Sequence, residues 1–417
     1  MEAKRVVITG IGTINPLGNN INEFFANLIK GESGADLITY FDTTNFKTKF
    51  ACEVKNYDSA NYFDRKEVRK HDLYSQFGMI AADQAIADAK ISKDLADPFK
   101  IGVIWASGIG GIRTFFEEVK GFIEGGGIPR FNPFFVPKML PDICAGYISI
   151  KHGFCGPNYA TVSACASSTH ALIEAMNHIR RGRAVIMVAG GSESAISEAG
   201  VGGFNSMQAL SVNNDNYKKA SCPFDKNRDG FVIGEGAAGL VLEEYEHAKA
   251  RGAKIYAEVM GGGMSADAHH LTAPHPEGLG AASVMNTAIE DANLKIEDFD
   301  YINVHGTSTP LGDIAELKAI QKVFGDHVSR LNISSTKSMT GHLLGAAGAL
   351  EALACVCSIQ NQIIPPTINF ETPDPEIDYE KINLTLNKAQ ERKVNVTLSN
   401  NFGFGGHNAA IVLKKLD

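Results

Sequence analysis

Cys165 has the sequence surroundings of a reactive cysteine. An extended run ends at Val162, and apolar residues with helical spacing follow from Ser168, so the thiol lies near the amino-terminal end of a helix. The helix macrodipole and the free N–H groups there favour a thiolate, and small neighbouring residues leave room for a substrate. A buried structural thiol, the commonest state of a cysteine, is the alternative.

Two histidines could act as the base or electrophilic partner that a nucleophilic cysteine needs. His305 ends a strand-like run and is followed by small hydroxyl residues in the stretch HGTSTP. His342 starts a helical segment rich in glycine and alanine, and Lys337 lies shortly before it. Each histidine alone could be a satisfied core residue. Together with Cys165 they predict one site.

A glycine-rich loop, NNFGFGGHN around Phe402, precedes the last strand-like run. It carries no Walker signature, but it could present a backbone N–H to an oxyanion. Residues 234–239 match the dinucleotide pattern GxGxxG yet lead into a strand instead of a helix. We therefore expect no cofactor.

Strand-like and helical stretches alternate along the chain, which is typical of layered α/β proteins. The predicted strands span residues 5–9, 101–106, 184–189, 239–242, 302–304 and 409–413. The predicted helices span residues 69–90, 168–181, 279–292, 313–323 and 346–360.

A weak internal repeat relates two of the helical segments. SACASSTHALIEA around Cys165 aligns with TGHLLGAAGALEA around His342, and at the same offset Glu174 meets Glu351. Residues 7–12 similarly echo residues 258–263. Chance similarity between small-residue helices is the alternative, but a cysteine and a histidine at equivalent helix starts favour a duplication.

Composition restricts the class of protein. A chain of 417 residues exceeds what one hydrophobic core usually holds, so we expect two domains or two fused halves. The net charge of −8 implies no general affinity for nucleic acid. An odd count of 7 cysteines without paired CxxC spacing indicates a reduced, cytoplasmic protein.

Two further features argue against a membrane protein and a metal enzyme. The apolar run near the amino terminus is too short for a signal peptide, and the apolar stretch 343–359 contains Glu351, which favours a buried helix over a membrane span. His269, His270 and His275 lack the spacing and the acidic partners of a metal site.

These motifs together resemble the β-ketoacyl-acyl carrier protein synthases, and most closely the elongating branch of bacterial type II fatty acid synthesis. The similar stretches are SACASS with Cys165, HGTSTP with His305, STKSMTGHLLGAAG with Lys337 and His342, and NNFGFGGHN with Phe402. The supporting stretches SGIGGI, FNPFFVPKMLP and SCPFDKNRDGFVIGEGA extend the resemblance over nearly the whole chain. The Cys-His-His set separates this branch from the initiating synthases, which use Cys-His-Asn.

The resemblance implies a fold, a division of the chain and a quaternary structure. The fold is the α/β thiolase fold, in which duplicated βαβαβαβ halves form a five-layer α-β-α-β-α sandwich. Residues 1–252 would form the half that carries the cysteine, and residues 253–417 the half that carries both histidines. Such proteins are usually homodimers.

The resemblance also implies a decarboxylative Claisen condensation on acyl carrier protein. Cys165 would accept the acyl chain, with its own backbone N–H and that of Phe402 as the oxyanion hole. His305 and His342 would bind the malonyl thioester carbonyl and stabilise the enolate left by the loss of carbon dioxide. The carbanion would then attack the acyl-enzyme.

Further residues receive roles by the same resemblance. Lys337 and Glu316 match a polar pair that orders the site and its water. Phe402 matches a gate that opens on acylation, and Ile109 matches a residue whose bulk limits acyl-chain length. The other expected substrate contacts, most of them to the pantetheine arm, are Thr272, Thr307, Thr309 and Phe404.

A basic patch for the acidic carrier protein is expected on this acidic chain. The candidate residues are Lys66, Arg69, Lys70 and Arg130. A solvated helix start is the alternative interpretation of the first three. Two positions depart from the family: Gln208 stands where arginine is frequent, which bears on docking, and His407 stands where threonine is frequent, beside the Phe402 loop.

Asn303, Glu351 and Asn400 resemble a monovalent-cation site found in some relatives. Apart from this, the sequence predicts no metal. Other functions are compatible with parts of the pattern. A ketosynthase of a specialised polyketide or polyene pathway would have the same fold and residues. A non-catalytic chain-length factor would lack the nucleophile that Cys165 supplies, and a metal hydrolase or redox protein would bind a metal or a cofactor.

Overall fold

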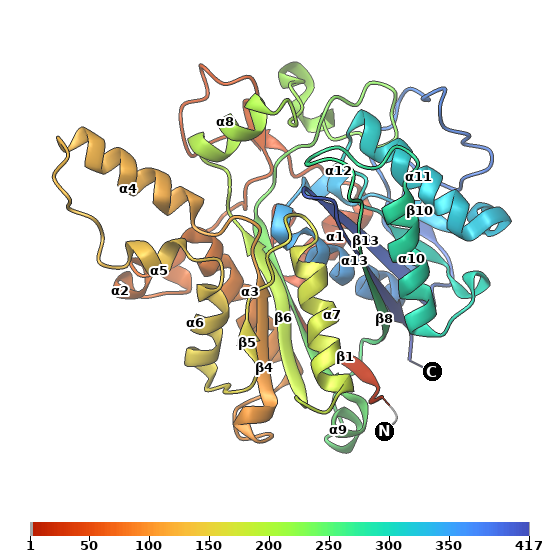
Figure 1. Cartoon of the computed structure of the whole chain (residues 1–417), viewed down its shortest axis with the longest axis horizontal. Coiled ribbons are helices and arrows are strands. Elements are labelled where there is room, and N and C mark those ends of the chain that lie inside the picture. Colours follow the sequence, from red (N-terminus) through yellow and green to blue (C-terminus); the bar gives the residue numbers. More distant parts are fainter. Residues whose placement is uncertain (1–2, 417) are drawn as a thin grey trace.

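The chain folds as two similar units, seen in a computed structural model that describes residues 3–416 (Figure 1). The first unit consists of β1 (Val6–Ile14), α3 (Leu73–Ala89), β4 (Ile101–Ala106), α6 (Ile143–His152), β5 (Asn158–Tyr159), α7 (Ser167–Arg180), β6 (Ile186–Glu193) and β7 (Gly236–Glu244). The second consists of β8 (Ala257–Ala266), α10 (Leu279–Ala292), β9 (Tyr301–Asn303), α11 (Pro310–Phe324), β10 (Asn332–Ser334), α13 (Ala347–Asn361), β13 (Val396–Gly403) and β14 (His407–Lys414).

The remaining elements are insertions and connections. The helices among them are α1 (Ile21–Lys30), α2 (Arg65–Val68), α4 (Ile112–Glu124), α5 (Phe135–Met139), α8 (Glu198–Ser206), α9 (Tyr245–Ala250) and α12 (Lys337–Thr340). The short strands are β2 (Asp36–Leu37), β3 (Phe50–Ala51), β11 (Ile363–Ile364) and β12 (Gln390–Glu391).

The strand order repeats the same topology twice. The main sheet has the order β10-β9-β13-β14-β8-β1-β7-β6-β4-β5. In the first unit β4 is parallel to β5 and β6, and β7 is antiparallel to β6 and β1. In the second, β9 is parallel to β10 and β13, and β14 is antiparallel to β13 and β8. The predicted duplication is confirmed, with an additional antiparallel strand at the end of each half.

The helices form three layers around the two halves of the sheet. Helices α3 and α6 cover the outer face of the first half, and α10 covers that of the second, with α11 packed beside α10. Helices α7 and α13 contact each other and strands of both halves, so they form the central layer. Figure 1 shows α6, β4, β6, α7, β8 and α10 in this order from left to right. This five-layer arrangement is the thiolase fold.

Glycines in the first strand of each half permit close packing of a helix. A Cβ added to Gly10 would lie 2.2 Å from the carbonyl oxygen of Ala85 in α3, and Gly12 faces the same helix. In the second half Gly261 and Gly263 face α10 in the same way. The similar sequences of β1 and β8 therefore follow from the same packing requirement. Glycine is needed where the helix lies against the strand, since real Cβ atoms cannot approach so closely.

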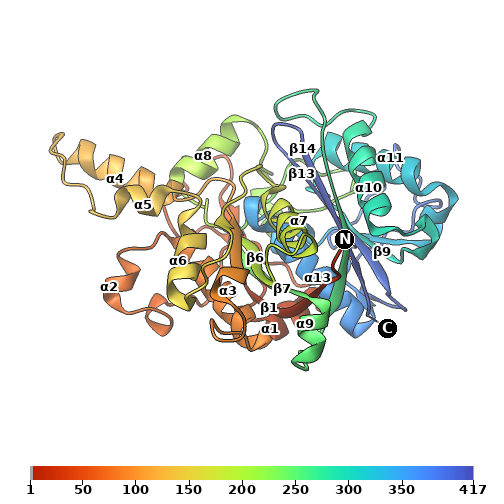
Figure 2. The same cartoon turned by 60° about the horizontal axis from the view of Figure 1, so that its bottom comes forward.

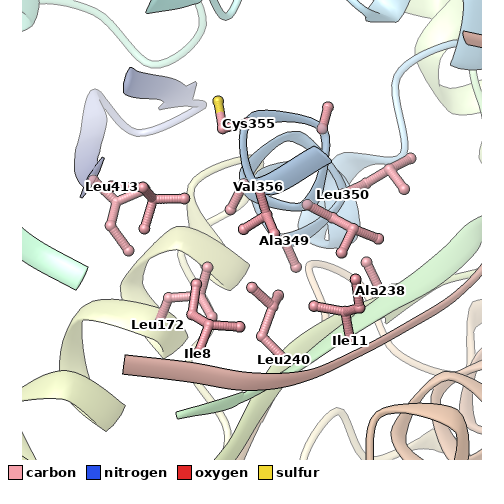
Figure 3. Packing of buried hydrophobic residues seen from close by; sticks show 14 of the residues in the cluster. Ile8, Ile11, Leu172, Ala238, Leu240, Ala349, Leu350, Cys355, Val356 and Leu413 are labelled. Atoms are coloured by element: carbon pink, nitrogen blue, oxygen red, sulfur yellow. The ribbon is translucent and has the colours of Figure 1, made fainter. Parts of the chain in front are cut away.

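The central helices pack into a large apolar cluster of the core. Figure 3 shows Leu172 of α7 and Ala349 of α13 packed over Ile8 and Leu240 of the sheet, with Leu413 beside them. An 18-residue segment, Leu344–Asn361, has the length and mean hydropathy of a membrane span, but 89% of it is buried inside the protein. The predicted buried helix in this stretch is therefore confirmed.

Several predicted elements differ from the structure. The helix predicted for residues 69–90 begins at Leu73, because the Asp72 side chain accepts a hydrogen bond from the backbone N–H of Tyr74 and caps it. Arg69 and Lys70 consequently lie outside α3. Strands β8 and β13 were not predicted, since three glycines interrupt the apolar pattern of β8 and polar residues fill the second half of β13.

An arm built from α4, α5 and the chain between them projects from the body (Figure 2). Aromatic rings stack along it: Phe122 on Phe131 and Phe131 on Phe135, with ring centroids 5.5 and 5.3 Å apart. Several apolar side chains of the arm are exposed, among them Ile123 and Val136. The arm thus presents apolar surface away from the core.

Candidate active site

Cys165 and His342 occupy equivalent positions of the two halves, on tight turns before the central helices. Ala164 has φ +50° and its equivalent Gly341 has φ +69°, a conformation that few residues adopt without strain. Each turn directs the following side chain to the junction between the halves. There His342 Nε2 lies 2.9 Å from Cys165 Sγ, across 177 residues of sequence.

His305 completes a three-residue group. It follows β9, and one ligating atom each from Cys165, His305 and His342 lies within 4.8 Å of the others. The two imidazole rings meet edge to face, with centroids 5.3 Å apart. The structure therefore brings together the cysteine and both histidines that the sequence singles out.

Burial governs the charge of Cys165. Burial raises the pKa of the Cys165 thiol to about 12, while the charge of Lys337 lowers this pKa and those of Glu193 and Glu351 raise it. The resting sulfur is thus a thiol, in contrast to the thiolate that the helix start alone predicts. The reason is that the free-energy cost of removing a thiolate from water exceeds the stabilisation that one helix end provides.

Both histidines are neutral. Burial lowers the pKa of His305 and of His342 well below 6.5, and the charge of Lys337 lowers both further. The Nδ1 atoms of both rings are buried without a hydrogen-bond partner in the described part of the chain. An orphaned buried donor is costly, so the tautomer with hydrogen on Nε2 is favoured. His342 can then donate from Nε2 towards Cys165.

Lys337 lies behind the site in a buried ion pair. Its Nζ hydrogen-bonds to a carboxylate oxygen of Glu351, and both side chains are almost fully buried. The Asn401 side chain donates to the other oxygen at 2.7 Å. Lys337 is therefore paired with Glu351 and not with Glu316, and it acts on Cys165 and the histidines through its charge.

Glu316 has a different contact. Its carboxylate accepts the backbone N–H groups of His305 and Gly306, each at 2.8 Å. Burial raises the pKa of Glu316 to about 7, although these two donors lower it. Glu316 thus fixes the backbone that carries His305.

One cavity of about 530 Å³ connects these groups with the surface. The sequence-predicted residues on its wall are Cys165, His305, His342, Glu316, Ile109, Thr272, Thr307, Thr309, Phe402 and Phe404. Sequence reasoning missed Phe204, Phe231, Met207, Leu271 and Leu344, which also line it. Their apolar character carried no signal, because it matches that of ordinary core residues.

The Phe402 loop lies directly over Cys165. The Phe402 ring is 5.6 Å from the His305 ring. A Cβ added to Gly403 would lie 3.0 Å from the backbone nitrogen of Cys165, so only glycine allows the loop this approach. His407 is exposed and pairs with Gly403 across the β13–β14 hairpin.

The expected basic patch is adjacent to the arm. Lys66 and Arg69 are exposed at α2, and the Asn132 side chain contacts the Arg69 carbonyl oxygen at 3.5 Å, which connects the arm to α2. Arg130 is exposed on the arm itself. Lys70 forms a 2.5 Å ion pair with Glu67, so part of its charge is neutralised.

Two of the cation candidates have free oxygens. The side-chain carbonyl oxygens of Asn303 and Asn400 are buried and have no hydrogen-bond partner among the described residues. Such oxygens are suitable ligands for a hard cation. Glu351 differs, because Lys337 and Asn401 already occupy its carboxylate.

Two domain models of one family match the chain. The model of the β-ketoacyl synthase N-terminal domain matches residues 3–248, and that of the C-terminal domain matches residues 256–371. The 3-oxoacyl-[acyl-carrier-protein] synthase 2 of Staphylococcus aureus (strain COL) is 46% identical over 418 residues, with 100% of this chain and 99% of the relative covered. The protein of the same name from Coxiella burnetii (strain RSA 493 / Nine Mile phase I) is 46% identical, with 100% of both chains covered.

Solved structures agree over the same length. A type II polyketide ketosynthase in complex with its acyl-carrier protein is 34% identical, with a TM-score of 0.92 and 100% of both chains covered. A β-ketoacyl synthase from Burkholderia phymatum STM815 is 35% identical, with a TM-score of 0.90, 99% of this chain and 100% of that chain covered. The site, the fold and these full-length similarities together show that the chain belongs to the β-ketoacyl synthase family.

Proposed function

We propose that this protein is an elongating 3-oxoacyl-[acyl-carrier-protein] synthase. It condenses malonyl carrier protein with an acyl chain bound to Cys165 and so extends fatty acids by two carbons. The observation that carries the proposal is the group of Cys165, His305 and His342, whose ligating atoms lie within 4.8 Å of one another on the wall of one cavity.

In the first half-reaction the Cys165 sulfur attacks the carbonyl carbon of an acyl-carrier thioester. The new carbon–sulfur bond replaces the bond to the carrier sulfur, and the thiol proton leaves on the departing carrier thiolate. The backbone N–H groups of Cys165 and Phe402 stabilise the oxyanion. The close approach of Gly403 to the Cys165 nitrogen supports this pairing, because it brings the loop over the reacting sulfur.

In the second half-reaction malonyl carrier protein loses its carboxylate as carbon dioxide. Neutral His305 and His342 donate hydrogen bonds to the thioester oxygen, where the enolate charge develops. Their lowered pKa suits donors and not strong bases, and decarboxylation supplies the carbanion without any base. The carbanion displaces the Cys165 sulfur from the acyl group as a thiolate, which regains a proton from water, and the 3-oxoacyl product is released.

The other site residues support these steps. Lys337 lowers the pKa of Cys165 and of both histidines, and Glu316 holds the His305 backbone. Phe402 acts as the gate between the two half-reactions. Ile109 limits the acyl chain, and the pantetheine arm passes Thr272, Thr307, Thr309 and Phe404, all of which line the cavity.

Intact-mass measurement tests the mechanism. The protein is incubated with a long-chain acyl-carrier protein, beside Cys165→Ala and the control Cys155→Ala, which removes an exposed cysteine outside the site. A mass gain equal to the acyl group in the wild type and in Cys155→Ala, absent in Cys165→Ala and discharged by malonyl carrier protein, is expected. An unmodified wild-type protein with every donor would contradict the proposal.

A polyketide or polyene ketosynthase is the second candidate, favoured by the 34% identity to a type II polyketide ketosynthase. The relatives named 3-oxoacyl-[acyl-carrier-protein] synthase 2 are closer, at 46%. Condensation products distinguish the two functions. A fatty acid enzyme extends chains whose β-keto groups have been fully reduced, whereas a polyketide or polyene enzyme extends chains that retain β-keto groups or conjugated double bonds.

Carrier protein docks on the basic patch of Lys66, Arg69, Lys70 and Arg130 in this proposal. The exposure of Lys66, Arg69 and Arg130 beside the arm supports it. The solved complex of a similar ketosynthase with its acyl-carrier protein supports the class of partner. Gln208 is exposed at the cavity mouth and offers an amide where relatives offer a charge.

We also propose a cytoplasmic homodimer in which residues 1–252 and 253–417 form the two halves of each chain. Helix α9 ends at Ala250 and β8 begins at Ala257, which supports the boundary. Strand β5 lies at the edge of the sheet, and the nearby side chains of Ile150 and Val162 are 81% and 58% exposed. An open edge with exposed apolar side chains supports an interface with a second copy of the chain. Sedimentation analysis would establish the number of chains.

A monovalent cation bound by Asn303 and Asn400 is part of the proposal, with Glu351 as a third, ion-paired neighbour. The free amide oxygens support it. A Tm that rises with added potassium or sodium in the wild type, but not in Asn400→Leu, is the expected result.

A further inference from the structure

Glu193 has no role in the chemistry above, yet it is a fully buried acid close to the site. It ends β6, and its side chain is 0% exposed. One carboxylate oxygen accepts the backbone N–H of Gly108 at 2.7 Å and that of Gly345 at 3.0 Å. The other accepts the N–H of Ile109 at 3.2 Å and the hydroxyl of Ser107 at 3.0 Å.

These donors belong to two loops from different halves of the chain. The first loop carries Ile109, and the second carries Leu344 directly before Gly345. Ile109 and Leu344 both pack in the apolar cluster of Cys165, and both line the cavity. The carboxylate of Glu193 therefore connects two walls of the cavity beside the nucleophile.

The two loops meet so closely that only glycine fits. A Cβ on Gly345 would lie 2.1 Å from the backbone nitrogen of Gly108 and 2.7 Å from Glu193 Oε2. A Cβ on Gly108 would lie 2.8 Å from the same oxygen. The close backbone approach of Gly108 and Gly345 and the hydrogen bonds of Glu193 therefore join the two loops at the same point.

The charge of Glu193 has no basic partner among its hydrogen-bond donors, which are three backbone N–H groups and one hydroxyl. Burial raises the pKa of Glu193 to about 7, and its hydrogen bonds oppose this rise. The acid also acts on the nucleophile, because its charge raises the pKa of Cys165. Burying a carboxylate without a basic partner costs free energy, so packing alone does not explain a glutamate at this position.

We propose that Glu193 is a positioning residue that holds the Ile109 and Leu344 walls in a fixed relation and thereby sets which acyl chains Cys165 accepts. The inference rests on the proposed function. It predicts that loss of the carboxylate leaves the nucleophile in place and makes the cavity wall deformable, since backbone N–H groups of the loops lose a charged acceptor.

The test compares Glu193→Gln and Glu193→Asp with the matched control Glu235→Gln. Glu235 is equally buried, but it accepts the Val54 N–H at 3.0 Å and the Ser194 hydroxyl at 3.0 Å, away from the cavity wall. Rates of Cys165 acylation are measured by intact mass with carrier proteins bearing short, medium and long saturated chains.

The ratio between the best and the poorest acyl donor should fall roughly tenfold in Glu193→Gln, the effect of one lost charge-assisted hydrogen bond. Glu193→Asp, which keeps the charge, should restore part of the ratio, and Glu235→Gln should stay within about twofold of the wild type. Unchanged chain selectivity in folded Glu193→Gln, or an equal change in Glu235→Gln, would overturn the inference.

A second measurement separates positioning from general loosening. Alkylation of Cys165 by iodoacetamide is followed against pH, and the thiol pKa should fall in Glu193→Gln because a neighbouring negative charge is removed. An unchanged pKa of the Cys165 thiol would contradict the effect of the Glu193 charge on the nucleophile. If the wild type accepts no acyl group at all, the proposed function fails, whereas the alkylation result still decides whether Glu193 acts on Cys165.

Discussion

Replacement of Lys337 by methionine should destabilise the protein strongly, because it leaves the Glu351 carboxylate in the core without its positive partner. Lys337 and Glu351 side chains are 2% and 3% exposed, so water cannot replace the lost contact. Only the Asn401 amide would still donate to the acid. Breaking a buried pair from one side costs about 3–5 kcal/mol. Part of that loss is avoided if Glu351 takes up a proton, since burial already raises its pKa.

The double variant Lys337→Met with Glu351→Gln should recover more than half of the loss. Glutamine keeps an oxygen for Asn401 and carries no charge, so neither member of the pair is left unpaired. The matched surface control is Lys219→Met, in an ion pair whose side chains are 61% and 62% exposed. It should change the free energy of unfolding by less than about 1 kcal/mol.

Urea unfolding at one fixed protomer concentration and pH provides the assay, because association would otherwise shift the apparent stability. A loss below about 1 kcal/mol in Lys337→Met would refute the reasoning, since it would mean that the interior solvates Glu351 without the lysine. A double variant no more stable than the single one would refute it equally, since the cost would then not come from the unpaired charge.

Three further outcomes are expected. The lowered histidine pKa values mean that the unfolded chain binds protons that the folded chain does not, so the histidine contribution to stability is present above about pH 6.5 and is lost below it. The carboxyls of Glu193, Glu235 and Glu316, whose pKa burial raises to about 7, act in the opposite direction in the wild type and in His305→Asn alike. The free energy of unfolding of the wild type minus that of His305→Asn should therefore fall from pH 7 to 5 by up to about 1.4 kcal/mol per pH unit. Ala164→Gly relieves a positive φ of 50° and should raise stability by about 1 kcal/mol in thermal unfolding, unless the turn is unstrained, in which case it lowers it. Gly10→Ala places a Cβ 2.2 Å from the Ala85 oxygen and should reduce soluble yield and Tm sharply, whereas Gly121→Ala, in open space on α4, should raise Tm slightly; similar effects of the two would contradict the close-packing argument.

Local signals in the sequence predicted some elements with accurate bounds and missed others. The helix at Leu279–Ala292 was predicted with its observed bounds, because its apolar period is regular. Strand β8 was missed because Gly261, Gly262 and Gly263 replace the apolar residues that mark a strand. Gly261 and Gly263 let α10 approach, and Gly262 lies against Ile173 of α7. Both are tertiary requirements that local propensity does not express.

For the site, the sequence predicted which residues would act but not how they are paired. Glycine-rich and small-residue motifs marked Cys165, His305 and His342. The partner of Lys337 could not be predicted, since Glu316 and Glu351 both lie on helices whose relative placement depends on the whole fold. Glu193 carried no signal at all, because its donors are backbone groups of distant loops.

The duplication gives a physical reason for a buried nucleophile at the junction of the halves. The equivalent helices α7 and α13 both begin near Cys165 and His342, so the positive ends of two macrodipoles and the charge of Lys337 meet at one cavity. Burial is the largest cause that holds the sulfur as a thiol and the histidines neutral. Negative charge that develops on the sulfur or on a thioester oxygen is then stabilised by these fixed groups without rearrangement of water. One half-fold alone would provide a single helix end, and the nucleophile would lack the two histidines that the other half supplies.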